Sequence, residues 1–104
     1  MATLSFTAFL NDEPIRFMVG SKCDLVRVVK ETAKTITLSI RPGTLSSERL
    51  TIHKGAAAAF MVCSASQCVK VTYVKRKSEG AYHLRFDATM HVKIYRPGYI
   101  GIRD

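Results

Sequence analysis

The sequence predicts an all-β fold, a small barrel or sandwich of short antiparallel strands. Apolar and polar residues alternate strictly in several segments, which is typical of strands with one face on a core and the other in water. Turn-forming sequences rich in Gly, Pro, Asn and Ser separate these segments, as they do in hairpin-connected sheets. Helical propensity is confined to 46–60, so at most one short helix is expected. The expected strands are 25–30, 36–40, 50–54, 58–63, 69–73, 82–86 and 92–94, and the expected turns are 11–14, 30–35, 41–43, 77–80 and 96–98.

Length and charge narrow the class of protein. A chain of 104 residues with 47% hydrophobic residues fits one compact domain, 1–104, with a core of its own. Sixteen Lys and Arg residues against eight Asp and Glu give a net charge of +8, which favours nucleic acid, an anionic surface or an acidic protein as partner. The longest apolar run, 55–63, is far below the roughly 20 residues of a membrane span. We therefore expect a cytoplasmic protein with no membrane contact.

The residues that could support catalysis or bind metal are sparse. Cys23, Cys63 and Cys68 are an odd number of cysteines without a ligand spacing, which indicates reduced thiols rather than a disulfide framework or a zinc site. The glycines form no phosphate-binding loop, and the acidic residues lie mostly at turns and termini, without a paired-carboxylate arrangement. We expect a protein that is not an enzyme and that uses no cofactor and no metal.

Two stretches of the chain repeat one another at an offset of about 43 residues. The segment 17–23 returns at 60–64, and a basic alternating strand, a turn and a second alternating strand follow each copy. This pattern predicts internal repeats at about 4–56 and 57–104 that form a pseudo-dimer within one chain. The alternative is chance similarity between strands of like pattern.

Alternation also assigns side chains to faces. One face of the predicted sheets interleaves Lys and Arg with Tyr and His and lacks acidic residues, a combination that can neutralise phosphates and stack bases. The alternative is a solvated face that protects the sheet from aggregation. Residues expected to point inward are Val69, Val71, Tyr73, Leu84, Phe86, Val92 and Ile94. Residues expected to point outward are Lys70, Thr72, His83, Arg85, His91, Lys93 and Tyr95, with Arg27, Thr37, Ser39, Thr51 and His53 in the first half. The run Lys75, Arg76 and Lys77 is expected at a hairpin tip.

The second half also resembles the carbon storage regulator family of bacteria and phages. The segments 50–54, 60–62, 69–75, 82–86, 87–92 and 94–96 follow the order of that family's strands and its closing motif. The resemblance implies interlocked β-repeats that bind GGA-bearing RNA loops and repress translation, with Arg96 and Ile94 as RNA contacts and Lys54 as their counterpart in the first copy. The chain departs from the family pattern at 3–10, which carries no cation, and at Pro97 and Gly98.

The leading hypothesis is therefore a non-enzymatic RNA-binding, post-transcriptional regulator. One alternative is a small basic protein-binding module, such as a phage-encoded inhibitor or adaptor, that docks on an acidic partner; a homodimer is compatible with either. Another is a divergent PilZ-type ligand-binding barrel, which 71–86 resembles although the nucleotide-binding motifs are missing. The candidate RNA-binding residues are Arg96, Ile94, Lys54, His53, Lys70, Arg85, Lys93, Tyr95, Lys75 and Arg76.

Overall fold

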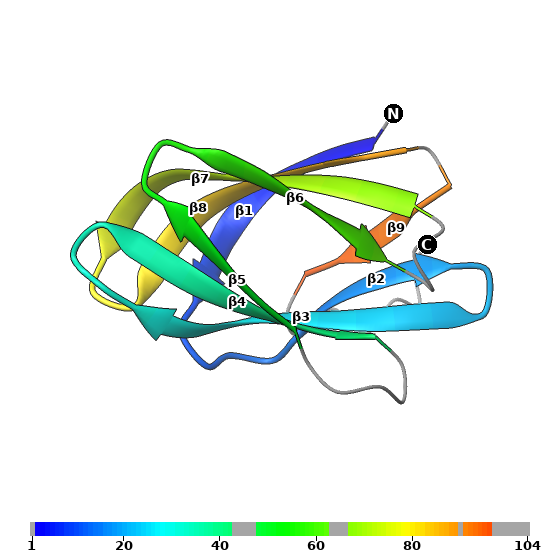
Figure 1. Cartoon of the computed structure of the whole chain (residues 1–104), viewed down its shortest axis with the longest axis horizontal. Coiled ribbons are helices and arrows are strands. Elements are labelled where there is room, and N and C mark those ends of the chain that lie inside the picture. The colour runs from blue at the N-terminus through cyan, green and yellow to red at the C-terminus, as the bar shows by residue number, and fades with distance from the viewer. Residues whose placement is uncertain (1, 43–47, 63–66, 90, 97–104) are drawn as a thin grey trace.

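The computed structural model describes residues 2–42, 48–62, 67–89 and 91–96, and this part of the chain forms nine strands in two sheets. The all-β prediction is confirmed, and of the two expected architectures, barrel or sandwich, the two sheets fit a sandwich; the described residues contain no helix. Figure 1 shows the two sheets as separate layers that approach each other where β5 leads into β6. The strands are β1 (Ala2–Phe9), β2 (Ile15–Val19), β3 (Lys22–Glu31), β4 (Thr35–Pro42), β5 (Glu48–His53), β6 (Ala57–Val62), β7 (Gln67–Ser78), β8 (Ala81–Ala88) and β9 (Lys93–Tyr95).

Every strand pairs antiparallel with its neighbours. The first sheet has the order β1-β8-β7-β6, and the second has the order β5-β4-β3-β2-β9. The hairpin turns β2–β3 and β7–β8 contain Gly20 at φ 60° and Gly80 at φ 74°. This left-handed backbone conformation is one that glycine adopts without a steric penalty.

The core fills the space between the two sheets. Phe17 of the second sheet is fully buried, and its ring packs edge-on against Phe60 of β6 and Phe86 of β8, with centroid separations of 5.6 and 5.3 Å. The inward residues predicted from alternation are buried, apart from Ile94, which is half-buried against the core. The buried ones are Val69, Val71, Tyr73, Leu84, Phe86 and Val92. Alternation thus identified the core-facing side of β7 and β8.

The chain passes from the second sheet to the first through the short turn between β5 and β6. Backbone hydrogen bonds anchor this turn on both sides. The Lys54 amide donates to the Lys34 carbonyl at 2.8 Å, and the Gly55 amide donates to the Tyr73 carbonyl at 2.7 Å. The turn therefore ties the β3–β4 turn of one sheet to β7 of the other.

Several expectations need correction. The run Lys75–Lys77 is part of β7 and not a hairpin tip, because the strand continues to Ser78 through two register shifts. Thr37 and Tyr95, expected to be exposed, are buried. Thr37 lies between Lys30 of β3 and Thr51 of the edge strand β5, and its hydroxyl and that of Thr51 hydrogen bond at 3.1 Å. Cys63 lies outside the described residues, as do the turn residues that were expected beyond Pro42 and beyond Arg96.

The strands β2–β5 and β6–β9 follow the order of the two predicted repeats, but their last members differ in position. β5 stays beside β4, whereas β9 leaves β8 and pairs with β2 of the other sheet. β1 occupies the place beside β8.

Among the described residues, no helix is long and apolar enough to cross a membrane.

Candidate nucleic-acid interface

The outer face of the second sheet collects positively charged side chains from all five of its strands. Residues directly opposite one another in a sheet project from the same face, so the register assigns each residue to a face. Arg16 lies opposite Leu25, which lies opposite Arg41 in the next strand. One row along, Arg27 lies opposite Ser39, which lies opposite Arg49. We call this surface the arginine face; its cations are Arg16, Arg27, Lys30, Arg41, Arg49 and Lys93.

Cations and uncharged residues alternate across the strands of the arginine face. Within each row, two arginines flank one uncharged residue, Leu25 in the first row and Ser39 in the second. Since neighbouring strands are spaced by about 4.8 Å, the backbone positions of the two arginines in a row are roughly 10 Å apart. The spacing limits repulsion between the guanidinium groups and leaves room between them for an anionic group.

Fixed contacts orient two of these arginines. The Arg16 guanidinium lies over the Tyr95 ring, 4.9 Å from its centroid. Tyr95 is only 8% exposed, although it belongs to the outer face by register. The Arg27 Nε donates a hydrogen bond to the Asp12 carbonyl at 3.0 Å. Arg41 and Arg49 are exposed. The face therefore combines pre-oriented and adaptable guanidinium groups.

The acidic residues of these five strands have the register of the opposite, inner face. They are Asp24, Glu31 and Glu48, and their register partners are Phe17, Ile36 and Ile40, whose side chains are buried in the core. The three carboxylates consequently have the register of the inner face. Within the described strands of this sheet, the outer face therefore carries only positive formal charge.

A small depression lies between two of the arginines. Its volume is about 140 Å³, and Arg27 and Arg41 contribute to a lining that is mostly apolar. Ser39 contributes a hydroxyl to the lining. The remaining lining residues are Pro14, Leu25 and Val29.

The outer face of the first sheet has a different charge pattern. Lys70 lies opposite Asp87, which lies opposite Thr3. The Asp87 carboxylate accepts a hydrogen bond from the Thr3 hydroxyl at 2.8 Å and forms an ion pair with Arg85 at 3.4 Å. We call this surface the mixed face; its ionisable residues are Lys70, Lys75, His83, Arg85 and Asp87. The expectation of a basic face without acids therefore fails on this sheet.

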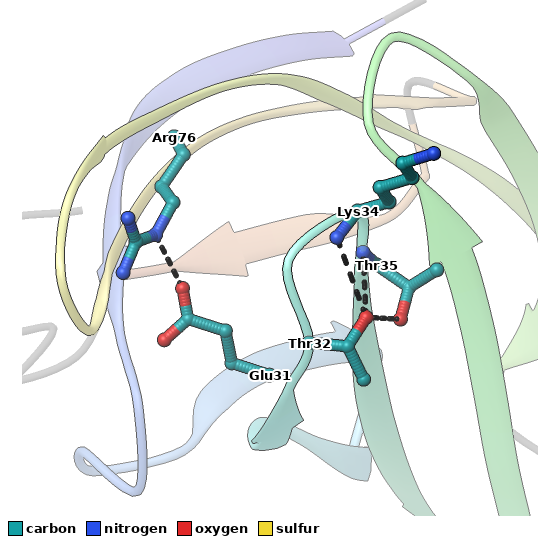
Figure 2. A network of polar contacts seen from close by, with 5 residues as sticks. All are labelled: Glu31, Thr32, Lys34, Thr35 and Arg76. Atoms are coloured by element: carbon teal, nitrogen blue, oxygen red, sulfur yellow. Dashed lines mark hydrogen bonds and ion pairs between the residues drawn. The ribbon is translucent and has the colours of Figure 1, made fainter.

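Arg76 belongs to neither face. It ion-pairs with Glu31 across the two sheets, as Figure 2 shows. Burial opposes ionisation of Glu31, but the hydrogen bond and charge of Arg76, with the other hydrogen bonds that the carboxylate accepts, together outweigh it, so the pKa of Glu31 lies below its ordinary value. Burial, with the charge of Glu31 nearby, raises the pKa of Tyr82. Beside this pair, Figure 2 also shows the Thr32 hydroxyl accepting hydrogen bonds from the backbone amides of Lys34 and Thr35. The cluster links the ends of β3 and β7.

The structure thus distributes the sequence-predicted RNA-binding residues over several regions. Lys70, Lys75 and Arg85 lie together on the mixed face. His53, Lys93 and Tyr95 belong to the arginine face by register, on its two edge strands. Ile94 faces the core, and Lys54 is in the β5–β6 turn. Arg76 is paired with Glu31, and exposed Arg96 follows β9.

Sequence reasoning missed Arg16, Lys30, Arg41 and Arg49. A signal for two of them was present, because Arg41 continues the outward phase of Ser39 by one step and Arg49 precedes Thr51 in the same phase. Lys30 was assigned to a basic strand but not to a face. Its place on the outer face depends on the register shift between Val28 and Lys30, which alternation does not predict.

Comparisons with protein-family models, curated proteins and solved structures find no match to this chain. Among the described residues, no group of three or more His, Cys, Asp or Glu side chains is placed to hold a metal ion.

Proposed function

We propose that this protein is a non-enzymatic RNA-binding regulator that holds single-stranded or looped RNA on the arginine face. The observation that carries the proposal is the segregation of charge on the second sheet, where cations from five strands face outward and the three acidic residues have the inner register. A surface of this kind attracts the phosphate backbone and releases its counterions. By occupying an RNA segment, the protein would block access of other factors to it.

The chemistry of the cations favours RNA over a generic anion. Four of the six are arginines, whose planar guanidinium groups bind phosphate through two hydrogen bonds and stack on bases. Sequence-specific RNA recognition usually involves unstacked bases in loops, which a sheet surface can accommodate. An acidic protein, the competing partner, could pair its carboxylates with the same guanidinium groups but would offer no nucleobases for them to stack on.

A pair of charge-matched variants tests this proposal. Lys30→Ala/Arg41→Ala/Arg49→Ala removes three cations from the arginine face, and Lys70→Ala/Lys75→Ala/Arg85→Ala removes three from the mixed face. Fluorescence anisotropy would measure the affinity of each variant for a labelled GGA hairpin and for a scrambled hairpin at 50 and 200 mM salt. Melting temperatures would establish that both variants fold.

We expect the first variant to lose at least ten times more RNA affinity than the second, with a shallower salt dependence. Equal losses would contradict the proposal, because they would mean that binding reflects net charge alone. Binding of an acidic protein at affinities that exceed those for both RNAs would favour the adaptor hypothesis instead. Preference for the GGA hairpin over the scrambled hairpin would support the resemblance to the carbon storage regulators.

A further inference from the structure

We infer that the depression between Arg27 and Arg41 holds a single unstacked pyrimidine base of the bound RNA. This inference rests on the proposed function and specifies what the arginine face recognises besides phosphate. It places one base-sized site, lined by residues of β3, β4 and the segment before β2, within a field of phosphate-binding cations.

The size of the depression fits one aromatic ring. Its volume is about 140 Å³. For comparison, an apolar cavity of about 150 Å³ engineered into another protein binds benzene. A pyrimidine has one ring of this size, whereas a purine adds a second ring that the depression would leave outside.

The lining suits a nucleobase in its chemistry as well. Pro14, Leu25 and Val29 offer apolar surface to the face of a ring, and the Ser39 hydroxyl can donate to or accept from its polar edge. Arg27 and Arg41 complete the lining with planar guanidinium groups that stack on bases. A ring seated here would keep its phosphates near the remaining cations of the arginine face.

Arg27 is partly fixed before any ligand arrives. Its Nε donates to the Asp12 carbonyl, which leaves the terminal guanidinium nitrogens for an incoming group. Side chains that are held in place lose less conformational freedom on binding. Exposed Arg41, on the neighbouring strand, is the adaptable side of the site.

The test uses an eight-nucleotide strand of abasic sugar phosphates and the same strand with one central uridine or one central adenosine. These strands carry equal charge, so any difference in affinity reports the base. We expect uridine to improve affinity about five- to tenfold over the abasic strand, and adenosine to improve it less.

Two variants separate the depression from the surrounding charge. Ser39→Leu fills the depression without changing charge, and Arg41→Lys keeps the charge but removes the plane. Both should reduce the uridine advantage to less than twofold, while Ser39→Leu leaves affinity for the abasic strand unchanged. The matched controls on the mixed face, Thr72→Leu and Arg85→Lys, should preserve the uridine advantage.

Failure of this inference can be distinguished from failure of the proposed function. If the abasic strand binds with a salt-sensitive affinity that Lys30→Ala/Arg41→Ala/Arg49→Ala removes, but uridine adds nothing, then the base site is wrong and RNA binding at this face stands. If no strand binds, both are wrong. Displacement of the uridine strand by an acidic tyrosine-bearing peptide that binds more tightly, and that Ser39→Leu excludes, would overturn RNA as the occupant.

Discussion

The two outer faces of this sandwich are built by the same rule and differ in their charge. Both consist of alternate residues of antiparallel strands, and both carry several cations. On the arginine face, acidic residues of the same strands have the inner register, whereas on the mixed face Asp87 lies directly beside Lys70 and ion-pairs with Arg85. The net charge is +8, but the register determines on which face of the sandwich the positive charges have no acidic neighbours.

The largest effect should come from breaking the core that holds both faces in place. Phe17→Ala removes a fully buried ring that contacts β6 and β8, and we expect it to cost about 3–5 kcal/mol of unfolding free energy. Chemical denaturation followed by circular dichroism would measure this loss. Phe9→Ala makes the same change at a ring that is 51% exposed, so its cost should be within about 0.5 kcal/mol. Similar costs for the two variants would contradict the packing described for Phe17.

Single substitutions should separate the two faces in the salt dependence of RNA binding. Arg41→Ala removes one cation from the arginine face. If RNA binds there as proposed, the slope of log affinity against log salt should become shallower by about 0.7, the value for one contact to a single strand. Lys70→Ala removes a charge beside Asp87 and should leave the slope nearly unchanged. Titrations at four salt concentrations would give both slopes. A larger change for Lys70→Ala would reverse the assignment of the faces.

The pair Glu31 and Arg76 should make stability depend on pH without affecting RNA binding. The pKa of Glu31 is lower in the folded state than in an unfolded chain, so its stabilising contribution is complete above the ordinary carboxyl pKa of about 4.3 and declines as the pH falls through the folded value. The melting temperature of the wild type should exceed that of Glu31→Gln at pH 7, and the difference should shrink below about pH 4. A constant difference across this range would show that ionisation of Glu31 contributes nothing.

The smallest expected effect sharpens the comparison from the other side. Asp87→Asn removes the acidic charge of the mixed face while keeping a hydrogen-bond acceptor for Thr3. RNA affinity at 50 mM salt should rise less than about twofold, because salt largely screens the repulsion between the Asp87 carboxylate and RNA bound on the other sheet. Anisotropy measurements would detect the change, and Thr72→Ser would serve as a neutral control on the same face. A tenfold rise would mean that the mixed face competes for RNA.

Alternation predicted the all-β fold and the inward residues of β7 and β8, because alternate residues of a strand lie on opposite faces. One face of these strands meets the core and the other meets water. It did not identify β1 as a strand, although Leu4, Phe6 and Ala8 alternate with polar residues there. It misplaced Lys75–Lys77 because register shifts extend β7 beyond the regular pattern.

The candidate site was less accessible from sequence than the fold. Charge and alternation predicted a basic sheet face but assigned it mainly to β7 and β8, and only the register shows that Arg16, Arg27, Arg41 and Arg49 surround Leu25 and Ser39. The burial of Tyr95 beneath Arg16 is a contact between β2 and β9, which are far apart in the sequence. These contacts depend on which strands become neighbours, and the pattern of residues along the chain does not reveal those neighbours.

The most direct test of the account is a nuclear magnetic resonance titration of the ¹⁵N-labelled protein with a single-stranded RNA. The side-chain Nε–H signals of Arg27, Arg41 and Arg49, with the backbone amides of β3–β5, should shift on binding. The Arg85 signal and the amides of β7 and β8 should stay in place. Shifts centred on Arg85, or spread equally over both faces, would contradict the assignment of RNA binding to the arginine face.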